Sequence, residues 1–312
     1  MGPGIAEYFY KNFAEFEDLR FSDFLKRNSG FKSWWLFSDF CIGDKDKPND
    51  TFAISICPAF EHPEVLVERI KGAIPQDLKK TRDIEEAATE FLKDGRMFHF
   101  VFVVEGRKYF FGETPDSRLN KSRLFCQQAF DLLVEFKAPK DVLKPFRQLL
   151  QESKAKSFNF NLLTNVVLFS SMMSFLNCML INHAGAKLIG MFPDRDKIES
   201  WCSSIYSHLI DNYTQGVLEL VEGRSFDYTL KRGVPSDQNV KNNWYDEFIR
   251  VPDYMAGVVA SWDIDLGTIG EGKHELLFMR NIVDSENVTV LRVKFDDSMI
   301  MEEVRASRKV GV

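Results

Sequence analysis

The sequence predicts an α/β protein whose mixed β-sheet is flanked by helices. Apolar, β-prone segments come early and close together, at 32–42, 51–57 and 97–104. Single strand-like segments at 187–192 and 225–231 then alternate with helical patterns. The segment 97–104 (MFHFVFVV) is almost unbroken in apolar residues, which is typical of a strand inside a sheet covered on both faces. Strands that alternate with helices are the pattern of an α/β fold.

The first third of the chain is expected to form a helical lead-in at 9–25 and then a β-hairpin. Its two strands are 32–42 (KSWWLFSDFCI) and 51–57 (TFAISIC), and the turn cluster GDKDKPND lies between them. Two short helices follow, each ended by a glycine, at 63–71 and 83–93. The strand 97–104 comes next, and Lys108–Gly112 is expected to add another after the turn at Gly106.

The rest of the chain is expected to be mainly helical. Helices are predicted from the spacing of apolar residues at 117–136, 141–152, 162–181, 198–209 and 244–262. The last of these is expected to break at Pro252, since proline removes a helical hydrogen bond. The tail at 276–300 mixes strand and helix signals and is left unassigned. No break in composition marks a second domain, so residues 1–312 are expected to form one domain, with a core at about 32–262, a helical insertion at about 117–183 and a C-terminal extension at 263–312.

The charge and cysteine pattern excludes several classes of protein. Apolar residues make up 45% and charged residues 28%, which argues against a disordered chain. The 40 basic and 46 acidic residues give a net charge of −6, which argues against a binder that relies on electrostatics alone. The five cysteines form no Cys-x-x-Cys pair, and the first residues contain no basic region followed by an apolar run, so no signal peptide is expected. These features favour a cytoplasmic protein.

The segment Leu162–Ile181 carries no charge and is long enough to cross a membrane. Its apolar residues recur in steps of three and four, while serine, threonine and asparagine occupy much of the remaining surface. No aromatic and basic belts bracket it. We therefore expect a buried central helix and no membrane association, with a membrane-inserted effector as the alternative.

Three aspartates lie where strands or helices begin, end or run through the apolar core. Asp39 lies within the first strand, where a buried carboxylate is costly unless it is paired or binds a metal; exposure on an edge strand is the alternative. Asp194 follows the strand 187–192, at the end where α/β proteins bind ligands, and Asp196 has the spacing of a helix N-cap. Asp253 follows Pro252, so it is expected at the second position of a helix, where stabilising the helix dipole is the alternative role.

Three carboxylates from distant segments would suit one hard divalent cation if they converge. Ligation by oxygen alone favours Mg²⁺ or Mn²⁺ over Zn²⁺. Two such ions about 3.5–4 Å apart can clamp the attacking and leaving oxygens of a phosphodiester. The acids therefore indicate a metal-dependent phosphodiesterase.

Several motifs resemble a bacterial and phage family, the domain of unknown function "thirty-eight hundred" of the ribonuclease H-like superfamily. The segment Ser38–Gly43 followed by 51–56 is similar to the family's opening strand and hairpin, and Asp77–Thr81 is similar to its Glu-Leu-Lys segment. A strand that ends in Phe-Pro-Asp-Arg matches at 192–195, and Pro-Asp-Tyr-Met-Ala-Gly-Val matches at 252–258. The matches keep the family's order from about residue 34 to 262.

The resemblance implies a ribonuclease H-like fold with a nuclease-type metal site that binds Mg²⁺ or Mn²⁺. It carries over Asp39, Asp194 and Asp253 as the metal-binding acids and places Lys79 near the phosphate. Phe40 stands where the family has glutamate, and no Ser-Gly follows. Asp44 or Glu85 are open as substitutes for the missing acid.

The sequence leaves two functional hypotheses open. The first is a metal-dependent nuclease that hydrolyses DNA or RNA in a bacterial or phage-defence setting, and the second is a degenerate ribonuclease H-like module that binds nucleic acid or a partner protein. Basic residues near the proposed site (Lys79, Lys80, Arg82) and along 140–156 suit a polyanion groove, or else a solvated surface. A homo-oligomer is also open.

Overall fold

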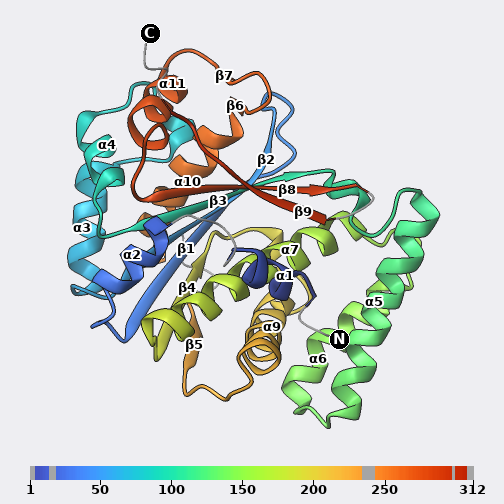
Figure 1. The fold of residues 1–312 in the computed structure, drawn as a ribbon. Coiled ribbons are helices and arrows are strands. Elements are labelled where there is room, and N and C mark those ends of the chain that lie inside the picture. Colours follow the sequence, from blue (N-terminus) through green and yellow to red (C-terminus); the bar gives the residue numbers. More distant parts are fainter. Residues whose placement is uncertain (1–3, 14–18, 234–242, 297–298, 308–312) are drawn as a thin grey trace.

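A computed structural model describes residues 4–13, 19–233, 243–296 and 299–307 (Figure 1). Residues 14–18 of the expected lead-in helix lie outside this described part. The centre of the molecule is one mixed sheet of seven strands in the order β5-β4-β1-β2-β3-β8-β9. The strands are β1 (Ser33–Cys41), β2 (Asp50–Pro58), β3 (Phe98–Glu105), β4 (Leu188–Pro193), β5 (Thr229–Arg232), β8 (Val288–Phe295) and β9 (Met299–Val304).

The sheet combines antiparallel and parallel pairs. β1 pairs antiparallel with β2, as the expected hairpin, and β2 pairs antiparallel with β3. β4 lies parallel to β1, β5 parallel to β4, and β8 parallel to β3, while β9 returns antiparallel along β8. The α/β prediction with a mixed sheet is confirmed, and the arrangement is consistent with a ribonuclease H-like fold. A separate two-stranded ribbon joins β6 (Trp262–Asp263) to β7 (Thr268–Ile269).

Side-chain alternation along the strands separates two apolar layers. On β1, Trp34 and Leu36 belong to one buried cluster, whereas Phe37 belongs to the other. Neighbouring strands repeat this alternation, so each face of the sheet buries its own layer against helices.

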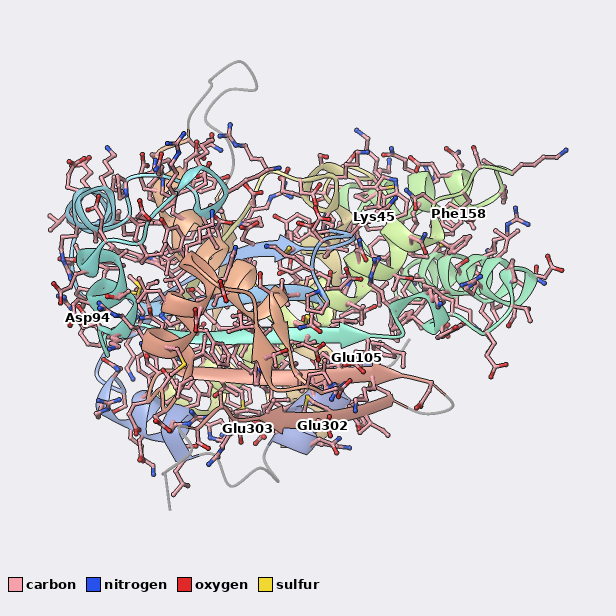
Figure 2. All side chains as sticks on the ribbon, turned by 90° about the horizontal axis from the view of Figure 1, so that it is seen from above. Lys45, Asp94, Glu105, Phe158, Glu302 and Glu303 are labelled. Atoms are coloured by element: carbon pink, nitrogen blue, oxygen red, sulfur yellow. The ribbon has the colours of Figure 1, made fainter. Side chains whose placement is uncertain are left out.

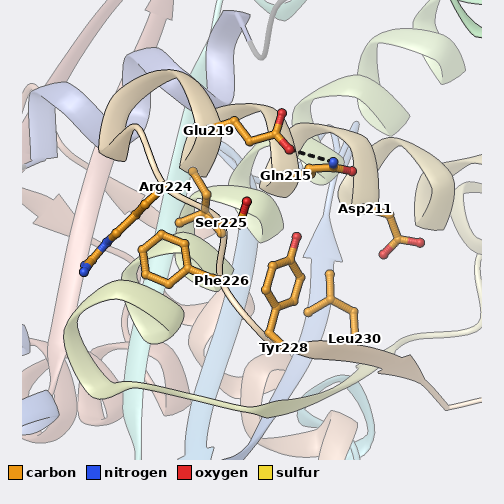
Figure 3. Close-up of a pocket in the computed structure, with 9 residues that line it drawn as sticks. Asp211, Gln215, Glu219, Arg224, Ser225, Phe226, Tyr228 and Leu230 are labelled. Atoms are coloured by element: carbon orange, nitrogen blue, oxygen red, sulfur yellow. Dashed lines mark hydrogen bonds between the residues drawn. The ribbon is translucent and has the colours of Figure 1, made fainter. Parts of the chain in front are cut away.

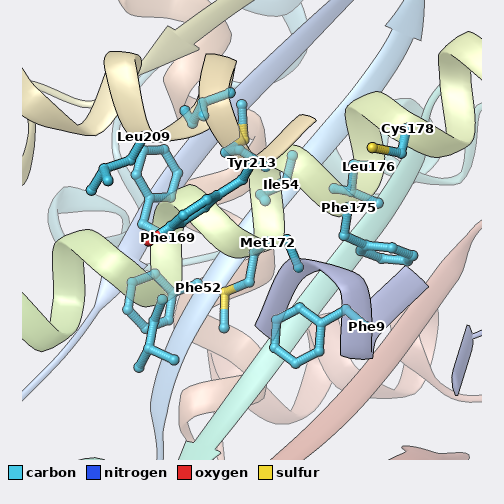
Figure 4. Packing of buried hydrophobic residues seen from close by; sticks show 14 of the residues in the cluster. Phe9, Phe52, Ile54, Phe169, Met172, Phe175, Leu176, Cys178, Leu209 and Tyr213 are labelled. Atoms are coloured by element: carbon cyan, nitrogen blue, oxygen red, sulfur yellow. The ribbon is translucent and has the colours of Figure 1, made fainter. Parts of the chain in front are cut away.

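The first layer lies under α1, α2, α7 and α9. Their bounds are α1 (Gly4–Phe13), α2 (Leu19–Arg27), α7 (Phe160–Met179) and α9 (Ile205–Glu222). Aromatic rings fill this layer, and Figure 4 shows Phe9, Phe169 and Phe175 among them. The ring centre of Phe175 lies 5.2 Å from that of Phe13, edge-on, and the ring centre of Phe9 lies 6.0 Å from that of Phe102 on β3. Helix α7 is the expected central helix. Within the segment Phe160–Ala184, the most apolar window has a mean hydropathy of 1.6 and is 94% buried, as is typical of a core helix.

The second layer lies under α3, α4, α10 and α11. Their bounds are α3 (Pro63–Ala73), α4 (Glu86–Lys93), α10 (Asp246–Ala260) and α11 (Lys273–Leu277), which continues into the π-helical turn η4 (Phe278–Ile282). Helix α10 packs directly on β1 and β2. The 3₁₀ turn η1 (Leu78–Lys80) lies against α10.

Two helices extend to one side of the sheet, α5 (Pro115–Glu135) and α6 (Lys140–Ser153) (Figure 1). Together with α7 they make up the region expected as a helical insertion. The short α8 (Lys197–Ser200) and the π-helical turn η3 (Leu180–Ala184) complete the helices around α7. The outer strand β9 carries Glu302 and Glu303 (Figure 2), and Glu303 forms an ion pair with Arg20 at 2.6 Å. Charges on an edge strand discourage pairing with other chains.

Three local predictions were wrong. The helix expected at 198–209 is interrupted between α8 and α9, where Cys202, Ser203 and Ser204 have positive φ angles. Lys108–Gly112 forms no strand, because the 3₁₀ turn η2 (Arg107–Tyr109) occupies this segment. Gly106 ends β3 with a φ of +66°, and a Cβ at this glycine would overlap the carbonyl of Phe295. The chain therefore turns away from the sheet here. The third error, the break at Pro252, concerns the site and is described below.

Candidate active site

Strand β1 holds Asp39 at the centre of the sheet. β1 pairs with β2 on one side and β4 on the other, so the alternative of an exposed edge strand is wrong. Asp39 lies two residues after Phe37 on β1, so both side chains point to the face that α10 covers. Its Oδ1 accepts a hydrogen bond of 2.7 Å from Phe40 N–H. The carboxyl group therefore lies between the sheet and α10.

Strand β4 brings Asp194 to the same place. Pro193 pairs with Ser38 in the parallel register, and Asp194 N–H donates to Ser38 O at 2.9 Å. Because Asp194 continues this register, it lies beside Asp39 at the carboxyl ends of both strands. Asp196 caps α8 with its side chain, which accepts from Lys197 N–H, so the prediction of an N-cap is confirmed.

Asp253 lies inside α10, which corrects the sequence prediction. Helix α10 runs without a break from Asp246 to Ala260 and contains Pro252, so Asp253 is not in its first turn. Proline costs the hydrogen bond to the carbonyl of Phe248. The helix tolerates this loss because the segment around it is buried on the sheet. Asp253 therefore does not act on the N-terminal end of the helix dipole.

A contact with a distant segment also holds Asp253. Its Oδ2 accepts a hydrogen bond of 2.7 Å from Leu78 N–H, at the start of η1. Leu78 packs against Gly257, where an added Cβ would lie 2.4 Å from Leu78 Cδ2. The glycine thus lets η1 approach α10 closely, and this approach places Lys79 beside the acids.

All four residues carried over from the family motifs line one cavity of about 470 Å³. Asp44 and Glu85, the two candidates for a missing acid, do not contribute to it. Sequence patterns identify Lys80 and Arg195, but they do not assign Asp77, Asp246 or Glu247 to the site. The complete lining is Asp39, Asp77, Lys79, Lys80, Asp194, Arg195, Asp246, Glu247, Ile249, Arg250 and Asp253.

Ion pairs neutralise the rim of this cavity and leave its centre charged. Lys80 pairs with Asp77 at 2.6 Å, Arg195 pairs with Asp246 at 2.6 Å, and Arg250 lies 3.9 Å from Glu247. Within the described part of the chain, the remaining lining residues with charges form no ion pair. These residues are Asp39, Asp194, Asp253 and Lys79.

The central acids resist ionisation. Burial raises the pKa of Asp39 well above its usual range, and the nearby charges of Asp253 and Asp194 raise it further. Burial also raises the pKa of Asp253, although the Leu78 amide opposes this shift. The like charges of the two carboxylates oppose the ionisation of both at once. Burial likewise raises the pKa of Asp194.

The donor set fits a hard divalent cation at the Asp39–Asp253 pair. The cavity lining contains carboxylates but no cysteine or histidine, which suits Mg²⁺ or Mn²⁺. Among the described residues, no group of three or more His, Cys, Asp or Glu side chains is arranged to hold an ion directly. Mg²⁺ needs only one or two carboxylates, because it keeps several waters and uses substrate phosphates as further ligands.

Phe40 faces away from this cavity. Its ring lies on the opposite face of the sheet, with its centre 5.4 Å from that of Phe52 and 5.0 Å from that of Phe169. A glutamate at this position would point into the apolar layer below α7. The phenylalanine therefore removes no ligand from the cavity, which corrects the expectation that a metal-binding acid is missing here.

A second cavity, of about 430 Å³, lies between α9 and the segment that leads into β5 (Figure 3). Asp211, Gln215 and Glu219 line it from the helix, and Tyr228 lines it from the opposite side. Burial raises the pKa of Asp211 to about 6. None of the four residues carried over from the family motifs contributes to this cavity.

Comparison with protein-family models, with curated proteins and with solved structures finds no match. The assignment of function therefore depends on the geometry and chemistry of the site.

Proposed function

We propose that this protein is a Mg²⁺- or Mn²⁺-dependent nuclease that hydrolyses phosphodiester bonds in DNA or RNA. The observation that carries the proposal is that Asp39, Asp194, Asp253 and Lys79 line one cavity. Within the described residues, they are its charged lining residues that form no ion pair. Three carboxylates and one ammonium group leave a formal charge of −2, which one divalent cation balances.

Each central residue has a distinct task in this proposal. Asp39 and Asp253 bind the cation, and this binding competes with protons because both carboxyls have raised pKa values. When bound, the cation supplies positive charge that stabilises the transition state and lowers the pKa of water. Lys79 neutralises a non-bridging oxygen of the scissile phosphate.

The hydrolytic step is the addition of water to phosphorus and the cleavage of one P–O ester bond. Asp194 accepts the proton of the attacking water. A carboxylate whose pKa is raised by burial is a better base than an ordinary exposed aspartate, so its environment suits this task. The departing oxygen takes up a proton from solvent.

The proposal includes a cytoplasmic location and membership of the ribonuclease H-like family that the motifs resemble. The five cysteines form no disulfide in the structure, which supports a reducing compartment. The family assignment rests on the motifs around Asp39, Asp194 and Asp253, and on a sheet of the expected class.

A second candidate is a module that binds nucleic acid or a partner protein without cleaving it. The observation in its favour is that no group of three metal-binding side chains is preassembled among the described residues. Calorimetric titration with Mn²⁺ separates the two candidates. The nuclease gives binding heat that Asp253→Asn removes, whereas the degenerate module gives none.

Asp194→Asn tests the catalytic assignment. Since a general base contributes about 10²–10⁴-fold, cleavage of a verified substrate is expected to fall by at least about 100-fold. The melting temperature should not fall, because the amide keeps the shape of the side chain. Asp227→Asn is the matched control, since Asp227 is exposed and pairs with Lys187 outside the cavity. Undiminished cleavage by Asp194→Asn rejects the assignment.

A further inference from the structure

Two charged side chains hold η1, the turn that carries Lys79, from opposite ends. At its start, Leu78 N–H donates to Asp253 Oδ2 at 2.7 Å. At its end, Lys273 Nζ of α11 donates to Leu78 O and to Thr81 O, each at 2.7 Å. The Asp253 carboxylate therefore accepts from an amide of the turn, and the Lys273 ammonium group donates to its carbonyls. This is the favourable arrangement for peptide dipoles.

A turn of three residues needs such support. A single 3₁₀ turn gains too few hydrogen bonds to offset the ordering of its backbone, and its last carbonyl groups have no partner within the turn. Leu78 O accepts from Thr81 N–H at 3.1 Å, and Lys273 adds a second donor there and supplies one to Thr81 O. The Tyr254 hydroxyl adds a contact of 2.9 Å with Thr81 Oγ1 and donates to Gln76 O at 3.2 Å.

Lys273 differs from the other residues that hold this turn because it lies outside the predicted core. It belongs to the segment expected as a C-terminal extension, and it does not line the cavity. Its side chain is half-buried, and both of its described hydrogen bonds go to the backbone on either side of Lys79 and Lys80. Its effect on a bound phosphate must therefore pass through the position of the turn.

Resting on the proposed function, we propose that Lys273 is a positioning residue that fixes η1 so that Lys79 faces the scissile phosphate beside the Asp39–Asp253 pair. The segment after residue 262 is then part of the active site. Without Lys273, Thr81 O loses this donor, Leu78 O is left with the Thr81 N–H, and the turn samples other conformations. Lys79 then contacts phosphate only part of the time, so substrate binding weakens while the acid pair remains intact.

A double-mutant cycle on the full chain tests this role. With saturating Mg²⁺ and a verified oligonucleotide substrate, Lys273→Met is expected to raise KM about tenfold and to change kcat by less than about threefold. Lys79→Met should have a similar effect. The double variant should be no worse than Lys79→Met alone within about twofold, because Lys273 acts only through Lys79. Lys26→Met on α2, outside the cavity, controls for the loss of one positive charge.

The cycle distinguishes positioning from a general structural role. A structural effect would add to that of Lys79→Met, so additive losses, or a wild-type KM in Lys273→Met, overturn the positioning role while leaving the nuclease proposal in place. Failure of the wild-type protein to bind Mn²⁺ and to cleave overturns the nuclease proposal and this inference together. If Lys273→Met does not fold, Lys273→Arg enters the same cycle, with the same non-additivity expected.

Discussion

Asp194 of the chain after β4 lies beside Asp39 of β1 because its amide donates to Ser38 O at 2.9 Å and continues the parallel register. A backbone hydrogen bond thus sets the relation between two carboxylates from distant parts of the sequence. Asp253 completes the group from above the sheet, since α10 packs across β1. Strand β1, the chain after β4 and helix α10 thus bring three like charges together, and this arrangement costs stability.

The first prediction concerns Asp39→Asn in protein free of divalent cations. This substitution removes the carboxylate whose ionisation the site opposes most, while an amide of the same shape remains. The free energy of unfolding at pH 8 is expected to rise by about 0.5–2 kcal/mol, the usual gain when a functional site loses its strain. Denaturant unfolding with and without the substitution measures the gain.

The gain should depend on pH in a defined direction. The pKa of Asp39 is higher in the folded than in the unfolded protein, so the native state holds the proton more tightly. Its contribution to stability therefore falls as pH rises from about 4 through the raised pKa. The difference between Asp39→Asn and wild type should be near zero at pH 4 and largest at pH 8. A pH-independent difference would contradict this account.

A second prediction separates the two roles of Asp253. The asparagine of Asp253→Asn still offers an oxygen to Leu78 N–H but carries no charge, whereas Asp253→Ala loses both. Both variants should lose Mn²⁺ binding in calorimetry. Only Asp253→Ala should also lose about 1–3 kcal/mol of stability, the cost of an unsatisfied buried donor. Equal stability of the two variants would show that the hydrogen bond to Leu78 contributes nothing.

Sequence patterns identified the central strands and the four residues that meet in the cavity. The β1–β2 hairpin, the apolar strand β3 and the strand β4 before Asp194 have strong local signals: alternation, turn clusters and unbroken apolar runs. Such local signals are enough to place Asp39 on a strand and Asp194 directly after one. Their juxtaposition depends on the order of the strands, which no local pattern contains.

The sequence did not predict the acids at the rim of the cavity or the unbroken helix α10, for physical reasons. The sequence around Asp77 and Asp246 is typical of solvent-exposed acids. The packing of η1 and α10 brings both side chains to one cavity. Pro252 carries a strong local signal for a helix end, but the burial of the α10 face on the sheet outweighs one lost hydrogen bond. The role of Lys273 could not be found either, because its two acceptors are backbone carbonyls of a distant turn.

A third prediction tests which face of the sheet residue 40 occupies. Phe40→Glu restores the acid found in the resembled family, but the structure directs it toward Phe52 and Phe169. The substitution should destabilise the protein by about 3 kcal/mol or more, through lost aromatic packing and an unpaired carboxylate in an apolar layer. Mn²⁺ affinity should not increase. A stable variant that binds Mn²⁺ more tightly would place position 40 at the cavity.

A last prediction joins cation binding to the raised pKa values of the acid pair. A divalent cation binds the ionised carboxylates, so it competes with the protons that the raised pKa values of Asp39 and Asp253 favour. Its affinity should therefore increase as pH rises through these pKa values. The stabilisation at 100 times the Kd is about 2.7 kcal/mol. At one fixed Mn²⁺ concentration, the rise in melting temperature should be clear at pH 8 and small at pH 5.

Asp39→Asn should abolish the rise at both pH values, while Asp227→Asn should leave it unchanged. A rise of the same size at pH 5 and pH 8 would place the cation elsewhere, since only binding at this pair competes with its proton.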